Sequence, residues 1–197
     1  MNKPTRPSAD ATRKKILKSA RKVFVKNGFS GASIGQIAKT AQINKSLIYH
    51  HFEDKASLWK AVKYEIVEKT FKNYSYDFET SFGLKVFLED FIKKRAQLFR
   101  KNPDMSRMIL WQSLEPQEKA LRWDDRRDLG EKLTQAIIEL QKNGSLRDDI
   151  SFEMVQVYLL YGVSSSYNAK HDALKDDTSW EGYLDILVDC VYRSLKA

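Results

Sequence analysis

Two short helical patterns, joined by a tight turn, occupy residues 33 to 52. Ser33 precedes Gln36 by three residues, the spacing at which a hydroxyl and an amide cap each other's backbone donors at a helix start. Asn44 is placed to cap the second helix. Only one turn fits between the two helices, which predicts a helix-turn-helix whose second helix enters a DNA major groove. A compact helical hairpin without a DNA-binding role would show the same periodicity.

The residues around this motif follow a distinctive order between positions 11 and 60. They are Thr12, Arg13, Lys14, Lys15, Ile16, Leu17, Ala20, Phe24, Gly28, Phe29, Ser33, Ile37, Ala38, Ser46, Ile48, Tyr49, His51, Phe52, Lys55 and Leu58. This order resembles the N-terminal signature of the TetR family of bacterial transcriptional regulators. The run from Leu47 to Phe52, followed by Lys55, is its most specific part, and later residues match the family only in general character.

Positive charge is concentrated in the first third of the chain. Up to residue 63 there are 14 Lys and Arg against 3 Asp and Glu, although the whole chain has 34 against 26 and a net charge of +8. A basic surface confined to one region indicates a polyanionic partner such as DNA. An anionic membrane is the alternative, but the basic helices keep their apolar residues in core-facing stripes and have none to insert into lipid.

The sequence also indicates a compartment. No run approaches the roughly 18–20 apolar residues of a transmembrane helix, and the polar N-terminus lacks the apolar segment of a secretory signal. Cys190 is the only cysteine, so no internal disulfide is expected. These features favour the reducing cytoplasm and predict no membrane association.

Helical periodicity continues to the C-terminus without an internal repeat or an alternating strand pattern. We therefore predict an all-α fold of about nine helices, with an N-terminal three-helix head and a C-terminal helical ligand-binding and dimerisation domain. Residues 1–10 are expected to form a flexible basic arm, either a solvated tail or a DNA contact. Residues 11–54 form the DNA-binding domain, and residues 55–197 form the regulatory and dimerisation domain.

The last two predicted helices, residues 152–167 and 180–195, carry many apolar residues. The first is apolar on nearly every side, which predicts a helix that is buried on several sides. Family members pair their last two helices into a four-helix bundle, so the resemblance implies a homodimer. The predicted interface residues are Leu184, Leu187, Val188 and Val191. The alternative is that both helices belong to the core of a single chain.

The larger domain has more aromatic and sulfur-containing side chains than a slim bundle requires, which suits binding of an apolar or aromatic small molecule. The predicted ligand-binding residues are Phe87, Phe91, Arg95, Met108, Trp111 and Tyr158. Ordinary core packing explains each of the apolar ones equally well. Arg95 interrupts an apolar stripe, so it either pairs with a core carboxylate or meets an anionic group on the ligand.

No motif for catalysis or for a cofactor is present. The chain lacks a glycine-rich phosphate loop and a nucleophile elbow, so we expect no enzyme activity, no catalytic residue, no cofactor and no metal site. His50 and His51 are adjacent and diverge by about 100° on a helix, so they cannot hold one metal ion together. A module that binds acidic proteins would explain the basic head, but not the Tyr-His-His-Phe ending of the second helix.

The DNA-contacting residues are divided by role. The exposed start of the second helix places Lys45, Ser46 and Leu47 against base edges, where Leu47 suits a thymine methyl group. The resemblance assigns Ser33, Tyr49, His50 and Lys55 mainly to phosphates, and phosphate contacts position a protein without specifying a sequence. The family usually has glycine where Ser46 stands, which puts a close approach to DNA there in question.

Together these features predict a dimeric, sequence-specific DNA-binding transcriptional regulator. It would act as a repressor on a near-palindromic operator in double-stranded DNA and would leave that operator when a small apolar or aromatic effector binds. The alternative is a ligand-independent or activating regulator with the same fold.

Overall fold

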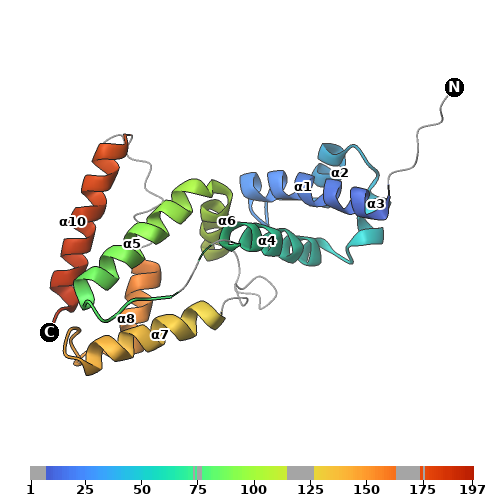
Figure 1. The fold of residues 1–197 in the computed structure, drawn as a ribbon. Helices are drawn as coiled ribbons and strands as arrows, with labels where there is room; N and C mark the ends of the chain where they lie inside the picture. The colour runs from blue at the N-terminus through green and yellow to red at the C-terminus, as the bar shows by residue number, and fades with distance from the viewer. Residues whose placement is uncertain (1–7, 73, 75–76, 115–126, 163–173, 175) are drawn as a thin grey trace. The chain divides into compact units, whose positions relative to one another are not determined.

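The computed structural model describes residues 8–72, 74, 77–114, 127–162, 174 and 176–197 (Figure 1). These residues are helical with connecting turns, which confirms the predicted all-α fold. They divide into two compact units. Unit 1 comprises residues 1–73 and 103–123, and unit 2 comprises residues 74–102 and 124–197. Most of the predicted arm and the end of the predicted helix 152–167 lie outside the described residues.

The described residues of unit 1 form five helices. They are α1 (Ala9–Asn27), α2 (Ile34–Ala41), α3 (Lys45–His51), α4 (Lys55–Phe71) and α6 (Pro103–Leu114). The first helix starts at Ala9, inside the predicted arm, because the Ser8 hydroxyl accepts a hydrogen bond from the Ala11 backbone N–H. Gly28 ends α1 at a φ of 73°, a conformation that glycine adopts without steric cost.

An aromatic cluster forms the centre of unit 1. Trp59 of α4 is fully buried, and its ring meets Phe24 of α1 edge-on at 4.9 Å between centroids. Phe29, in the turn after α1, meets the same indole at 5.6 Å. Removing a buried aromatic ring of this size typically lowers the free energy of unfolding by about 3–5 kcal/mol. This cluster therefore fixes α4 and the α1–α2 turn on one core.

The helix α6 packs with the DNA-binding head, although it lies far from it in sequence. Its Trp111 indole N–H donates to the Val25 carbonyl oxygen at 3.1 Å, and Arg21 donates to the Asp104 carboxylate at 2.6 Å. Met108 lies between Asp104 and Trp111 in the sequence, and its side chain is fully buried. Both polar contacts join α6 to α1, so α6 braces the head from the middle of the chain.

Unit 2 is built from α5 (Leu84–Lys101), α7 (Arg127–Lys142), α8 (Phe152–Val157), a π-helical turn η2 (Tyr158–Gly162) and α10 (Asp177–Leu195). The last helix packs along α5, and α7 packs against α8. Ion pairs between Lys93 and Asp185 (2.8 Å) and between Arg100 and Asp177 (2.6 Å) border the α5–α10 contact.

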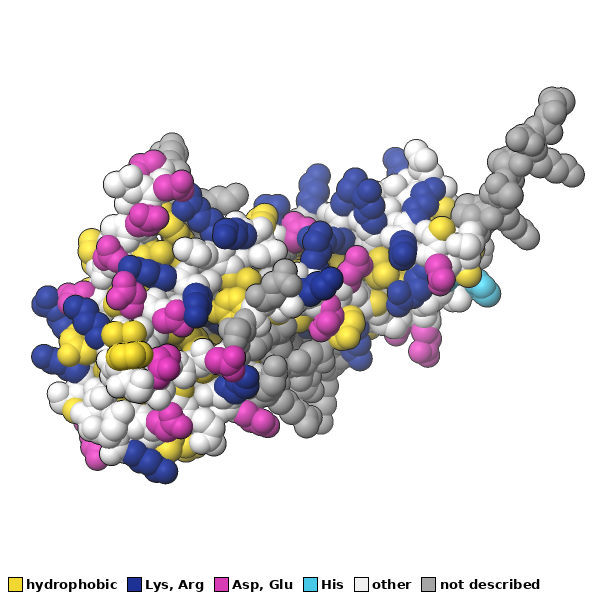
Figure 2. All heavy atoms as spheres, viewed as in Figure 1, with side chains coloured by type: hydrophobic (Ala, Val, Ile, Leu, Met, Phe, Trp, Pro, Cys, Tyr) yellow, Lys and Arg dark blue, Asp and Glu magenta, His cyan; other side chains and the backbone are white. Residues whose placement is uncertain are grey.

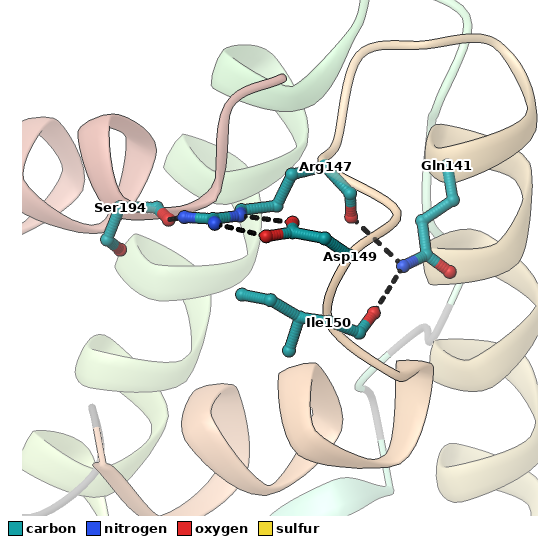
Figure 3. A network of polar contacts seen from close by, with 5 residues as sticks. All are labelled: Gln141, Arg147, Asp149, Ile150 and Ser194. Carbon is teal, nitrogen blue, oxygen red and sulfur yellow. Dashed lines mark hydrogen bonds and ion pairs between the residues drawn. The ribbon is translucent and has the colours of Figure 1, made fainter.

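A polar network closes the turn that follows α7 (Figure 3). The Gln141 side-chain amide donates to the carbonyl oxygens of Arg147 (3.1 Å) and Ile150 (2.8 Å). The Arg147 guanidinium pairs with Asp149 and also reaches the Ser194 carbonyl oxygen at 3.4 Å. Its hydrogen bonds hold the pKa of the Asp149 carboxyl below its usual value. The turn is thereby attached to the C-terminal end of α10.

Candidate DNA-binding interface

The recognition helix α3 is held by a cap at its start and a buried residue at its centre. The Asn44 side-chain oxygen accepts hydrogen bonds from the Leu47 backbone N–H and the Ser46 hydroxyl, both at 2.8 Å. This confirms Asn44 as the cap. Ile48 is fully buried, which turns the opposite side of the helix outward.

The outward side of α3 carries four exposed residues, which are Lys45, Ser46, Tyr49 and His50. Leu47, predicted to touch base edges, is half-buried and lies at the border of this face. The Lys45 side chain lies close to Gly35, where a methyl group added to the glycine would come within 3.2 Å of the lysine Cε atom. The structure therefore brings the predicted base-reading residues together at the start of α3.

The turn between α2 and α3 depends on a residue that the sequence analysis did not single out. Gln42 adopts a left-handed conformation, with φ 52° and ψ 50°. Its backbone N–H donates to the Lys39 carbonyl oxygen, and that of Ile43 donates to the Ala38 carbonyl oxygen, both at 3.1 Å. Non-glycine residues populate this conformation at a cost of roughly 1–2 kcal/mol. The tight turn is thus closed by backbone hydrogen bonds against a local conformational penalty.

The start of α2 shows the predicted reciprocal cap. The Ser33 backbone N–H donates to the Gln36 side-chain oxygen at 2.9 Å, and the Gln36 N–H donates to the Ser33 hydroxyl at 3.2 Å. Ser33 is exposed, so its assignment to a DNA phosphate stays a prediction. Its hydroxyl has a demonstrated role in starting α2.

The structure gives Lys55 an internal role that its sequence position did not reveal. Its ammonium donates to the carbonyl oxygens of Phe29 (3.0 Å) and Ala32 (3.1 Å) and lies 4.3 Å from the centre of the Phe29 ring. Two of its three donors are used inside the protein. Lys55 therefore clamps the first turn of α4 to the segment that leads into α2, and one donor is left for a phosphate.

The start of α4 is fixed beside this clamp. The Asp54 carboxylate accepts a hydrogen bond from the Ser57 backbone N–H at 2.6 Å, and the Asp54 backbone N–H donates to the Ser57 hydroxyl oxygen at 3.2 Å. The hydrogen bond from the Ser57 backbone N–H is the main cause that lowers the pKa of the Asp54 carboxyl. The cap therefore contributes stability at neutral pH and loses it as the pH falls through that lowered pKa.

Exposed basic residues are numerous on this unit. Figure 2 shows many Lys and Arg side chains over the part of the molecule that Figure 1 labels α1 to α4, with fewer acidic ones between them. Within the described part of the chain, no three His, Cys, Asp or Glu side chains are grouped as metal ligands would be. None of the described helices has the length and apolar character needed to cross a membrane. A basic surface with an exposed, capped recognition helix suits the phosphates and base edges of DNA.

Comparisons with known proteins agree with this geometry. Residues 16–62 match the family model described as bacterial regulatory proteins of the tetR family, and residues 88–181 match the tetracyclin repressor-like C-terminal domain. The chain belongs to the TetR family. It is therefore a DNA-binding transcriptional regulator, and members of this family are not enzymes.

Individual relatives cover most of this TetR-family chain. It is 26% identical over 165 residues to the transcriptional regulator UidR of Escherichia coli strain K12, covering 82% of this chain and 84% of UidR. It is 24% identical over 188 residues to the transcriptional repressor AcnR of Corynebacterium diphtheriae, covering 92% of each. A putative fatty acid metabolism regulator of Clostridium perfringens shares the fold, with a TM-score of 0.70 and 17% identity over 91% of this chain and 97% of that one.

Three of the residues predicted to bind a ligand form one cluster within unit 2 of this TetR-family regulator. Phe87 and Phe91 stack at 6.0 Å, and the Arg95 guanidinium lies 5.8 Å from the Phe91 ring and 5.0 Å from the Phe99 ring. Phe78 joins this cluster at 5.8 Å from Phe87. Phe78 and Phe99 were not among the predicted ligand-binding residues. Phe99 does continue the four-residue spacing of Phe87, Phe91 and Arg95.

The other three predicted ligand residues belong to other helices. Met108 and Trp111 belong to unit 1, where they pack α6 onto the head. Tyr158 lies in the π-helical turn of unit 2 and is 38% exposed. The aromatic cluster around Arg95 is therefore the part of the predicted ligand site that the structure assembles.

The residues predicted for the dimer interface lie on α10. Leu184, Val188 and Val191 are buried within a single chain, on the helix that packs along α5, and Leu187 is half-buried. Three of these four side chains are covered by their own chain, and their place in a dimer interface stays a prediction. The stripe that the sequence made prominent is the inner face of α10.

The helix predicted to be buried on several sides instead leaves several of its apolar residues exposed. Among the described residues of α8 and η2, only Val155 and Leu159 are buried. The exposed apolar residues of α8, η2 and α10 are Met154 (68%), Val157 (57%), Tyr158 (38%), Tyr161 (71%) and Ile186 (65%). We call these five residues the outer apolar face of unit 2.

The Lys55 clamp generates a prediction. Replacing Lys55 with Met keeps the aliphatic stem and removes the ammonium, so two carbonyl oxygens lose their donor. We expect the free energy of unfolding to fall by about 1–3 kcal/mol, measured by urea denaturation. Lys60→Met, at an exposed position on the same helix, is the matched control and should change stability by less than about 0.5 kcal/mol. Equal stability of the two variants would show that the clamp contributes nothing.

Proposed function

We propose that this regulator is a homodimeric repressor that binds a near-palindromic operator and is released from it by a small molecule. The observation that carries the proposal is the outward face of α3, on which Lys45, Ser46, Tyr49 and His50 are exposed above a buried Ile48. A helix with such a face places three or four side chains against one half-site of a major groove. The name of the relative AcnR, a transcriptional repressor, favours repression.

The roles on DNA follow from this face. Lys45 and Ser46 meet base edges, with Leu47 at the border of the face, because all three stand in the first turn of α3. Tyr49, His50 and Ser33 flank that turn and contact phosphates. Lys55 contributes one phosphate contact at most, since two of its donors are bound to carbonyl oxygens.

A second copy of the chain is proposed because one recognition helix reads only one half-site. The outer apolar face of unit 2 is the proposed contact, since Met154, Val157, Tyr161 and Ile186 are each more than half exposed in the single chain. Large apolar side chains that one chain leaves exposed are candidates for protein–protein contacts. They lie on α8, η2 and α10, in the part of the chain that family members use for pairing.

A ligand is proposed for the cluster of Arg95 with Phe78, Phe87, Phe91 and Phe99. Aromatic faces and a guanidinium suit an aromatic molecule that carries an anionic group. The chain itself supplies a route to the head, because α5 ends at Lys101 and α6 begins at Pro103. Since α6 packs on α1 and α4, a shift of α5 that moves α6 would also move the head. A regulator that needs no ligand, or that activates transcription, is the alternative.

Sequence-specific binding is tested by selection from a pool of random DNA duplexes. The wild-type protein should enrich a near-palindromic site. Lys45→Ala should weaken binding to the selected duplex and relax the preference at one position of each half-site, by about 1–3 kcal/mol for a well-formed base contact. Tyr49→Phe removes a phosphate donor and should weaken all sequences equally. If the wild-type protein enriches no site, the proposed function is wrong.

Dimerisation is tested by two charged substitutions on α10. Ile186→Asp places a carboxylate on the outer apolar face, so light scattering should report a folded monomer with operator affinity reduced by roughly 10²–10⁴-fold. Val188→Asp buries an unpaired carboxylate inside the chain and should instead abolish cooperative unfolding. Thr178→Asp, at an exposed polar position of the same helix, should leave the dimer intact. A dimeric Ile186→Asp protein would place the interface elsewhere.

Ligand release is tested with matched aromatic compounds that do or do not carry a carboxylate. We expect carboxylates to weaken operator binding, measured by fluorescence anisotropy, by roughly 5–150-fold at saturation. Arg95→Met should lose the preference for the carboxylate, whereas Lys94→Met, on the neighbouring exposed position, should keep it. Compounds that bind without changing operator affinity would contradict ligand release and favour the ligand-independent alternative.

A further inference from the structure

A row of lysines runs along the outer side of α1. Lys14, Lys18, Lys22 and Lys26 follow one another at intervals of four residues, and Lys15 stands beside the first. All five are exposed, and we call them the lysine ridge. At 1.5 Å per residue the ridge is about 18 Å long, with one charge roughly every 6 Å.

The other two basic residues in the middle of α1 have partners inside unit 1. The Arg13 guanidinium lies 5.2 Å from the centre of the Phe52 ring, and Arg21 donates to Asp104 at 2.6 Å. Among the residues that the structure describes, none forms an ion pair with a ridge lysine. The fold of unit 1 therefore uses the two arginines and leaves the lysines to solvent.

On helices α5 and α10 of unit 2, basic residues form ion pairs within their own helix. Lys93 and Lys94 on α5 each pair with an acid four residues earlier, Glu89 and Asp90, at 2.7 and 2.8 Å. On α10, Arg193 pairs with Asp189 in the same way at 2.8 Å. In α1, Asp10 is the only acidic residue and lies before the ridge.

Like charges four residues apart on a helix destabilise it by roughly 0.2–0.5 kcal/mol per pair. The ridge contains three such pairs in succession, from Lys14 to Lys26. Within the described part of the chain no ion pair offsets this repulsion, so a polyanion bound along the ridge would relieve it. The length and spacing of the row suit a partner whose charges also repeat along a line.

We propose that the lysine ridge binds the phosphate backbone of duplex DNA outside the segment that α3 reads. This proposal rests on the proposed operator binding. The ridge begins next to Arg13, whose partner Phe52 directly follows α3, so the row starts beside the end of the recognition helix. Each DNA strand carries one negative charge per 3.4 Å of helix axis, which gives the row successive phosphates to contact.

The chemistry of the ridge favours DNA over a membrane. Lysine ammonium groups are mobile point charges that bind phosphate without demanding one geometry. No large apolar side chain of α1 is exposed among the described residues, so the helix has nothing to insert between lipid tails. Contacts of this kind add affinity and salt dependence to operator binding, and leave base preference unchanged.

The test compares two variants that each remove four positive charges. The ridge variant carries Lys14→Gln, Lys18→Gln, Lys22→Gln and Lys26→Gln. The control variant carries Lys85→Gln, Lys101→Gln, Lys142→Gln and Lys196→Gln, all at exposed positions of unit 2. Anisotropy titrations over a range of salt concentrations use three duplexes: the selected operator alone, the same operator with flanks of about ten base pairs, and a mixed-sequence duplex of equal total length.

The wild-type protein should bind the flanked operator more tightly than the bare one. The ridge variant should lose that gain, and its plot of log affinity against log salt on the flanked duplex should be shallower by about 3–4 per chain if all four lysines contact phosphates. The control variant should keep both the gain and the slope. Both variants should enrich the same site in selection, and circular dichroism should show both fully folded.

A ridge variant that retains the flank gain and the wild-type salt slope would overturn the proposal. A second result would also overturn it. If the wild-type protein bound phosphatidylserine vesicles, the ridge variant did not, and DNA flanks added no affinity, the partner would be a membrane. Failure of the proposed operator binding can be distinguished from failure of the ridge proposal. If no site is enriched, the salt slopes of the two variants on the mixed-sequence duplex still decide whether the ridge holds DNA.

Discussion

The burial of Trp59 against Phe24 and Phe29 is the interaction on which the DNA-binding head depends. Phe29 also lies beneath the Lys55 ammonium, which is bonded to the carbonyl oxygens on either side of the turn before α2. Ser33 then starts α2, and the α2–α3 turn sets the position of α3. A displacement of α4 would therefore pass through the aromatic cluster to the recognition helix.

Arginine and lysine side chains serve different purposes on α1. Its arginines are used for internal contacts, one on an aromatic ring and one on a carboxylate, where a planar guanidinium is effective. Its lysines stay on the surface, where a repulsive row is tolerated because an outer polyanion can neutralise it. The proposed ridge extends the DNA surface beyond the helix-turn-helix without adding any base recognition.

The C-terminal helix shows why an apolar stripe does not identify its own partner. Periodicity correctly marked Leu184, Val188 and Val191 as one face of α10. An apolar face is buried with equal ease against the same chain or against a second chain, so the pattern could not distinguish α5 from a partner subunit. Ile186 stood off the stripe and is 65% exposed, which makes it the better marker of an outer contact.

The sequence by itself determined the helices, the caps at Ser33 and Asn44, the basic head and the family, because these depend on neighbours within a few residues. Only the tertiary structure decided that Lys55 clamps a turn 26 residues earlier, that α6 braces α1, and that Arg95 gathers Phe91 and Phe99 around it. It also decided which face of α10 is covered. These features arise from contacts between segments far apart in the chain, and the spacing of residues along one helix carries no information about which segment packs against it.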